Sequence, residues 1–120
     1  MTRDAGPLAR GSADVIARAL AWADEDLDER TRTELQGTVD AARAHDPSAL
    51  AEVADAFSSR LEFGTAGLRG RLGPGPNRMN RVVVMQAAAG LAEYLRARGG
   101  GAVVIGFDAR HNSDVFARDS

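Results

Sequence analysis

Hydrophobic residues recur at helical spacing over the first half of the chain and predict three helices. The first helix is capped by Ser12 and runs to about Asp24, and the second spans residues 28–44. The third begins at Asp46, a favourable N-cap, with Pro47 at the first helical position. The apolar faces of these helices comprise Val15, Ile16, Ala19, Leu20, Ala23, Leu35, Val39, Ala42, Leu50, Val53, Ala54 and Phe57. The charged residues between them are expected to form a solvated face.

The second half of the chain combines a long helical pattern with a short apolar run. A helix capped by Asn80 is expected over residues 81–98, and the three glycines at 99–101 end it. Residues 102–105 lack polar alternation, which is typical of a strand buried on both faces. A last helix is expected after the cap Ser113. This order of elements predicts an α/β fold with a mixed sheet between helices. The buried stripe of the long helix is expected to comprise Val83, Val84, Ala87, Ala88, Leu91, Tyr94 and Leu95.

These elements divide the chain into a flexible start at residues 1–11, a helical lead-in at residues 12–60 and the start of an α/β domain at residues 61–120. About two strands precede Ser120, whereas a parallel sheet covered by helices needs further crossovers. We therefore expect the α/β domain to be truncated and the chain alone to be marginally folded. The apolar side chains expected to stay exposed are Val103, Ile105, Val115 and Phe116.

A glycine-rich segment, residues 61–81, separates the two halves and contains five glycines, two prolines and four arginines. Glycine costs backbone entropy, so a cluster of glycines indicates positive φ or a close approach of the backbone to another group. Arginine beside such glycines offers paired donors that suit phosphate oxygens, and backbone N–H groups aimed outward form an anion-binding concavity. The segment is therefore a candidate phosphate-binding loop, and the alternative is a glycine-rich turn with solvated arginines.

Composition narrows the class of partner. The chain has 15 basic residues, all of them arginine, and 17 acidic residues, and its net charge of −2 gives no bulk attraction to nucleic acid or to an anionic membrane. Because cysteine is absent, disulfide frameworks and thiolate metal sites are excluded. No apolar run approaches the length of a membrane span, and no signal-peptide core is present. We expect a cytoplasmic protein, and no pattern indicates an oligomeric state.

Two blocks in the second half are more specific than a glycine-rich turn. The first, Phe63–Gly70, has the sequence FGTAGLRG and is followed by GPNRMN at residues 75–80. The second, GFDARHNS, occupies residues 106–113. Together they resemble the N-terminal signature and the G-x-D-x-R-x-x-S turn of the α-D-phosphohexomutase superfamily, which includes phosphomannomutases, phosphoglucomutases and phosphopentomutases. The resemblance extends roughly from Trp22 to the end of the chain, and implies the first part of domain I of a four-domain enzyme.

The resemblance also implies an activity. Enzymes of this superfamily are isomerases of carbohydrate metabolism that move a phosphoryl group between the C1 hydroxyl and the terminal hydroxyl of a hexose or pentose phosphate through a phosphoserine. Mg²⁺ is the implied cofactor, and a sugar bisphosphate of the glucose-1,6-bisphosphate type is the implied activator. The chain contains neither the T-A-S-H-N-P type serine motif nor the D-G-D-x-D-R type metal loop. The 120 residues alone are therefore expected to be inactive, with the metal ligands outside them.

The same resemblance implies a set of site residues. Arg69 matches the superfamily arginine that reaches the phosphoserine and the bisphosphate intermediate. Thr65 and Gly64 are the hydroxyl and backbone donors expected beside it. Residues expected to support this loop are Asp108, Arg110, Ser113 and Arg78. For Arg110 an equal alternative is an ion pair within its own turn.

Two other function classes stay open at this point. A glycine-rich segment before a helix also suits a non-catalytic phosphate- or nucleotide-binding module. Against that class, the chain has no G-x-x-x-x-G-K-[ST] motif and no G-x-G-x-x-G motif between a strand and a helix. The third class is a helical interaction module built on residues 12–60.

Overall fold

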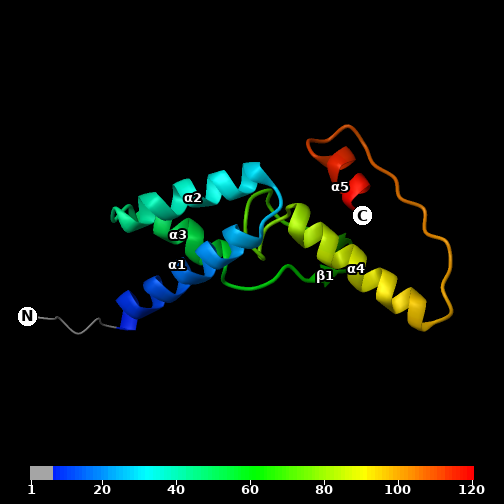
Figure 1. Cartoon of the computed structure of the whole chain (residues 1–120), viewed down its shortest axis with the longest axis horizontal. Helices are drawn as coiled ribbons and strands as arrows, with labels where there is room; N and C mark the ends of the chain where they lie inside the picture. Colours follow the sequence, from blue (N-terminus) through cyan, green and yellow to red (C-terminus); the bar gives the residue numbers. More distant parts are fainter. Residues whose placement is uncertain (1–6) are drawn as a thin grey trace, which may run out of the picture. The chain divides into compact units, whose positions relative to one another are not determined.

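Five helices and one small antiparallel hairpin make up residues 7–120, the part of the chain described by this computed structural model (Figure 1). Side chains are described from Gly11 onward. The contacts group the chain into two compact units, the first ending at Met79 and the second running from Asn80 to Ser120.

Three helices form the core of the first unit: α1 (Pro7–Glu25), α2 (Glu29–Arg43) and α3 (Pro47–Ala56). The predicted apolar faces of these helices meet, and the core consists of Ala19, Ala23, Leu35, Val39, Val53, Ala56 and Phe57. Trp22 packs edge-on against Phe57, with ring centroids 6.2 Å apart. The helical lead-in therefore buries its own core, and this core provides the support for the loop that follows.

Local capping explains where α2 and α3 begin. The Asp28 carboxylate accepts the N–H of Arg30, and the Asp46 carboxylate accepts the N–H groups of Ser48 and Ala49. These bonds satisfy donors that the first helical turn leaves open. The start predicted for α3 is therefore confirmed.

The predicted start of α1 is wrong. Ser12 lies inside the helix, because residues 7–11 are already helical and Pro7 is tolerated in a first turn. Of the predicted flexible start, residues 1–6 lie outside the described residues.

The second unit contains two helices, α4 (Arg81–Ala97) and α5 (Ser113–Asp119). The Asn80 side chain accepts the Val83 N–H at 2.9 Å, which confirms Asn80 as the cap of α4. Arg81 and Asp119 join the two helices through a bidentate pair, with Nε–Oδ2 at 2.7 Å and Nη2–Oδ1 at 3.0 Å. The hydrogen bonds from Arg81 hold the pKa of Asp119 below its ordinary value, so this pair contains a charged carboxylate at neutral pH.

Ser113 does not cap α5. Asn112 occupies the cap position in the left-handed region, with φ of 67°, and makes no side-chain capping bond. Ser113 is instead the first helical residue, and its hydroxyl oxygen accepts the Asp108 N–H at 3.1 Å.

The predicted strand at residues 102–105 is also wrong for this structure, and so is the mixed sheet. Within residues 7–120 this segment has no strand partner, and Val104 is 96% exposed. A strand needs a neighbouring strand that accepts hydrogen bonds from its N–H groups and donates hydrogen bonds to its C=O groups. Without such a neighbour, this apolar run lies exposed to solvent. The expected exposure of Val103 and Ile105 is confirmed, whereas Val115 and Phe116 are half-buried.

The stripe predicted for α4 is likewise less buried than expected. Val83 is buried, but Leu91 and Tyr94 are exposed. The apolar spacing therefore predicted the helix α4 correctly, but no other element covers most of its apolar stripe among the described residues. No helix among the described residues is long and apolar enough to cross a lipid bilayer.

Candidate functional site

The first signature block forms a hairpin of two very short strands, β1 (Phe63–Gly64) and β2 (Gly67–Leu68). Phe63 pairs with Leu68, and Gly64 pairs with Gly67. Thr65 and Ala66 make the turn. Gly67 has a φ of 93°, a backbone conformation that residues with a side chain rarely adopt. The hairpin therefore carries Gly64 and Thr65, two of the three predicted phosphate ligands, at its exposed end.

Arg69 directly follows β2 and is exposed. Within the described part of the chain, no hydrogen bond or ion pair holds its guanidinium group. The other arginines of the glycine-rich segment pair with carboxylates of the chain, and these are Arg71, Arg78 and Arg81. Arg69 thus differs from its neighbours: it presents a permanent charge that no carboxylate among the described side chains neutralises.

Two carboxylates on α3 hold the arginines that follow Arg69. Arg71 Nη2 lies 2.7 Å from both carboxylate oxygens of Glu52. Arg78, whose side chain is only 4% exposed, reaches Glu52 Oε1 at 3.1 Å and Asp55 Oδ2 at 2.6 Å through Nη2. We call these four residues the arginine–carboxylate cluster. Arg78 is thus held on α3 by two carboxylates, and its predicted role in supporting a phosphate-binding loop stays a prediction.

The cluster shifts the protonation equilibrium of Glu52. The Arg71 hydrogen bond is the largest cause, and it lowers the pKa of Glu52 against the opposing effect of partial burial. Arg78 lowers the pKa further. In return, the carboxylate raises the pKa of Arg71. Glu52 is therefore charged at neutral pH, where its carboxylate pairs with Arg71 and Arg78 of the loop.

Acid should weaken this cluster. Because the folded-state pKa of Glu52 lies below its ordinary value of 4.5, the stabilisation is complete above pH 4.5 and is lost as the pH falls through the lower folded value. We expect Glu52→Gln to lower the melting temperature at pH 6 only slightly, because exposed ion pairs contribute little to stability, and the difference from wild type to shrink below pH 4.5. Thermal unfolding followed by circular dichroism at several pH values measures this. A difference that is independent of pH, or an equal response in Glu34→Gln on α2, would contradict the prediction.

The loop over residues 71–79 is closed and rests on the end of α3. The Met79 N–H donates to the Arg71 carbonyl at 2.7 Å, which closes the loop. The Asn77 N–H donates to the Ala56 carbonyl at 3.0 Å, satisfying an acceptor at the end of the helix. Gly75 has φ of 114°, and a Cβ there would lie 2.8 Å from the Ala56 carbonyl oxygen. Glycine is therefore required where the loop backbone touches the helix.

The second signature block, in the other unit, forms a turn closed on itself. Asp108 Oδ1 accepts the Arg110 N–H at 3.0 Å, and Arg110 Nε lies 3.0 Å from Asp108 Oδ2. The Arg110 N–H is the main cause that lowers the pKa of Asp108. Together with the bond from the Asp108 N–H to Ser113, these contacts show Arg110 paired within its own turn. A role for these residues in bracing a serine loop stays a prediction.

The importance of Glu52 and Asp55 was missed by sequence reasoning, which placed both on a solvated face. One signal was available: residues three apart in a helix share a face, so both carboxylates are directed to one side of α3. Among the described residues, no group of three or more His, Asp or Glu side chains is placed to hold a metal ion.

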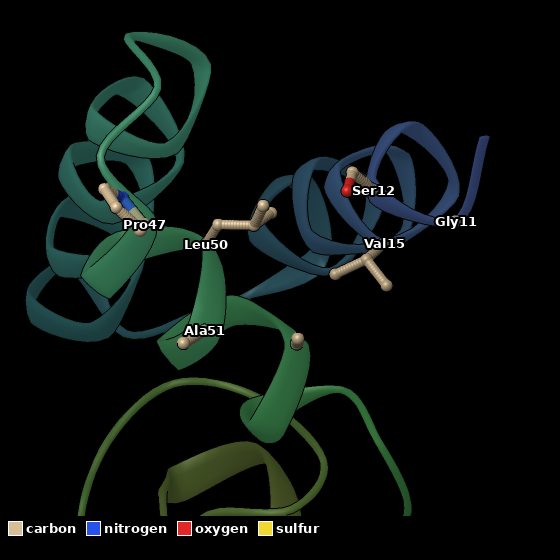
Figure 2. Close-up of a pocket in the computed structure, with 7 residues that line it drawn as sticks. Gly11, Ser12, Val15, Pro47, Leu50 and Ala51 are labelled. Atoms are coloured by element: carbon tan, nitrogen blue, oxygen red, sulfur yellow. The ribbon is translucent and has the colours of Figure 1, made fainter. Parts of the chain in front are cut away.

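A separate cavity of about 480 Å³ lies in the first unit between α1 and α3 (Figure 2). Its lining is apolar except for Ser12, and Leu50 of α3 points toward α1 across it. Gly11, Val15, Pro47, Ala51 and Ala54 complete the lining. A cavity without charged groups does not suit a phosphate, so the hairpin is the stronger candidate site.

Comparison with known proteins identifies the family of this chain. Residues 60–120 match the family model described as phosphoglucomutase/phosphomannomutase, alpha/beta/alpha domain I. A probable phosphoribomutase of Schizosaccharomyces pombe is 42% identical over 101 residues, which cover 81% of this chain and 16% of that protein. A phosphoglucomutase of Staphylococcus aureus is 46% identical over 68 residues, covering 56% of this chain and 12% of that protein. The chain thus spans at most 16% of the length of these two curated relatives. No solved structure matched the chain.

Proposed function

This chain belongs to the phosphoglucomutase/phosphomannomutase family, and from that premise we propose that it forms the N-terminal part of a phosphosugar mutase. Such an enzyme moves a phosphoryl group between C1 and the terminal hydroxyl of a hexose or pentose phosphate through a phosphoserine. The observation that carries the proposal is the exposed hairpin, which lies in the matched region and is followed by Arg69, a residue that pairs with no carboxylate of the described side chains.

The proposed role of this chain is to bind and stabilise a phosphoryl group. The Arg69 guanidinium stays charged at any working pH and can donate two hydrogen bonds to phosphoryl oxygens. Thr65 would add a neutral hydroxyl donor, and Gly64 would let the backbone approach closely. Phosphoryl transfer depends mainly on positioning and on charge stabilisation, so such donors act directly on its rate.

The remaining machinery is proposed to lie outside these 120 residues. The phosphoserine and the Mg²⁺ ligands belong to that part, and the bound metal would offset charge on the transferring phosphoryl group. A phosphosugar is the proposed substrate, a sugar bisphosphate the activator, and the cytoplasm the location. Residues 108–113 would support the phosphate-binding loop in the complete enzyme.

The test uses the product of the longest reading frame that contains this chain. We expect it to convert the 1-phosphate of glucose, mannose or ribose to the terminal phosphate in a coupled assay with Mg²⁺ and the bisphosphate activator. The 120-residue chain alone should give no turnover, because nucleophilic catalysis needs the missing serine. Failure of the longer product with all three sugars would contradict the proposal, whereas turnover would exclude the two non-catalytic classes.

A further inference from the structure

The hairpin that carries Arg69 has little structure of its own to hold its position. Each strand has two residues, and Phe63 in β1 is 71% exposed. An isolated two-stranded hairpin is marginally stable in water, so its orientation must come from the contacts at its base.

The first of these contacts are made by Leu61 and Gly70, which lie at the two ends of the hairpin. The Leu61 N–H donates to the Pro76 carbonyl at 3.1 Å, which ties the first end to the closed loop. The Leu61 side chain lies over Gly70, where a Cβ would be 2.7 Å from Leu61 Cδ1. Glycine at position 70 thus lets the two ends approach each other directly beside Arg69.

Beyond Gly70, two carboxylates of α3 hold the chain: Asp55 binds Arg78, and Glu52 binds both Arg71 and Arg78. Glu52 binds Arg71 through both oxygens and also binds Arg78, near the other end of the loop over residues 71–79. One side chain therefore grips both ends of that loop, and only Gly70 separates Arg71 from Arg69.

We propose that Glu52 is a positioning residue for Arg69: by holding Arg71 and Arg78 on α3, it sets the direction in which the hairpin presents the Arg69 guanidinium. The importance of Glu52 for phosphoryl transfer rests on the proposed function of Arg69. The anchoring of the loop by Glu52 does not depend on that function. The helical lead-in thereby takes part in the site without contacting the substrate.

The anchoring should affect local order more than global stability. Arg71 is 67% exposed, and exposed ion pairs contribute little to the free energy of unfolding. Positioning, however, is sensitive to small displacements, because a shift of about 1 Å in a reacting group can cost 10²-fold in rate. Loss of Glu52 is therefore expected to make the hairpin more mobile and the reaction slower, while the helical core stays folded.

The first test is backbone ¹⁵N relaxation on the 120-residue chain. In Glu52→Gln we expect the order parameters of residues 64–69 to fall, with those of α2 unchanged. Arg71→Met removes the same contact from the other side and should give the same result, so the test does not depend on one variant. Glu34→Gln, an exposed change on α2, is the matched control and should leave the hairpin unchanged. Unchanged order parameters in both Glu52→Gln and Arg71→Met would overturn the anchoring.

The second test is a double-mutant cycle in the active mutase. We expect Glu52→Gln to lower kcat about tenfold with little change in KM, and to cause no further loss in an Arg69→Ala background, because it acts through Arg69. An equal loss in both backgrounds would overturn the positioning role and indicate a general structural effect. If the wild-type product has no mutase activity, the proposed function falls, and the relaxation data alone decide the anchoring.

Discussion

Arg69→Ala is expected to lower the kcat of the complete mutase by roughly 10²–10³, the scale of one lost stabilising donor in a transition state. Gly67 and Gly70 flank Arg69, so the backbone can bend toward a phosphate there. The guanidinium can follow charge onto the equatorial oxygens as the bond to the transferring group loosens. Interactions formed mainly in the transition state lower kcat and kcat/KM together.

Variants of graded severity make this result specific. Arg69→Lys keeps the charge but loses the donor fork, so it should also be impaired. Thr65→Ala should lose less, because its hydroxyl is a neutral donor. Arg43→Ala, an exposed arginine of α2, is the matched control. Steady-state kinetics of the four variants and wild type are the measurement. A rise in KM with kcat intact in Arg69→Ala would make Arg69 a simple substrate anchor.

Phe57→Ala is expected to destabilise the first unit by about 3–5 kcal/mol, the usual cost of removing a buried aromatic side chain. Phe57 is 2% exposed, packs edge-on against Trp22, and belongs to the core of all three helices. Because a small domain has roughly 5–15 kcal/mol of stability, this loss would remove a large share of it. Unfolding of the unit would also remove the support of the hairpin, since α3 carries the residues that hold it.

The chain provides a matched control and a probe for this measurement. Phe63 is the same residue type on the surface, so Phe63→Ala should change the free energy of unfolding by less than about 0.5 kcal/mol. Trp22 is the single tryptophan and touches Phe57, so its fluorescence follows the loss of the core during urea unfolding. Similar urea midpoints for Phe57→Ala and wild type would contradict the assignment of this core.

Local sequence determined most of the helices. The starts of α3 and α4 follow from Asp46, Pro47 and Asn80, because capping joins groups only two or three residues apart. The apolar faces in the first unit were also predictable from helical spacing, since the three helices supply one another's partners.

The site was predictable in part. Clustered glycines located the hairpin, since positive φ and close backbone approach depend on the residue itself. The resemblance singled out Arg69, but the partners of Arg71 and Arg78 could not be foreseen. Glu52 is 19 residues from Arg71 and 26 from Arg78, and nothing in either local sequence specifies such a pair.

Burial in the second unit was decided by tertiary structure alone. An apolar, β-branched run at residues 102–105 has the intrinsic preference for a strand, and α4 has the spacing for a buried stripe. Strand preference and helical spacing indicate only which kind of surface a segment can pack against. Within residues 7–120, no element fully covers residues 102–105 or the apolar stripe of α4. Sequence by itself therefore determined the helices, their caps and the glycine turns, because those depend on neighbours along the chain. Strand pairing, burial and the arginine–carboxylate cluster needed distant partners, and only the folded chain shows which of them are present.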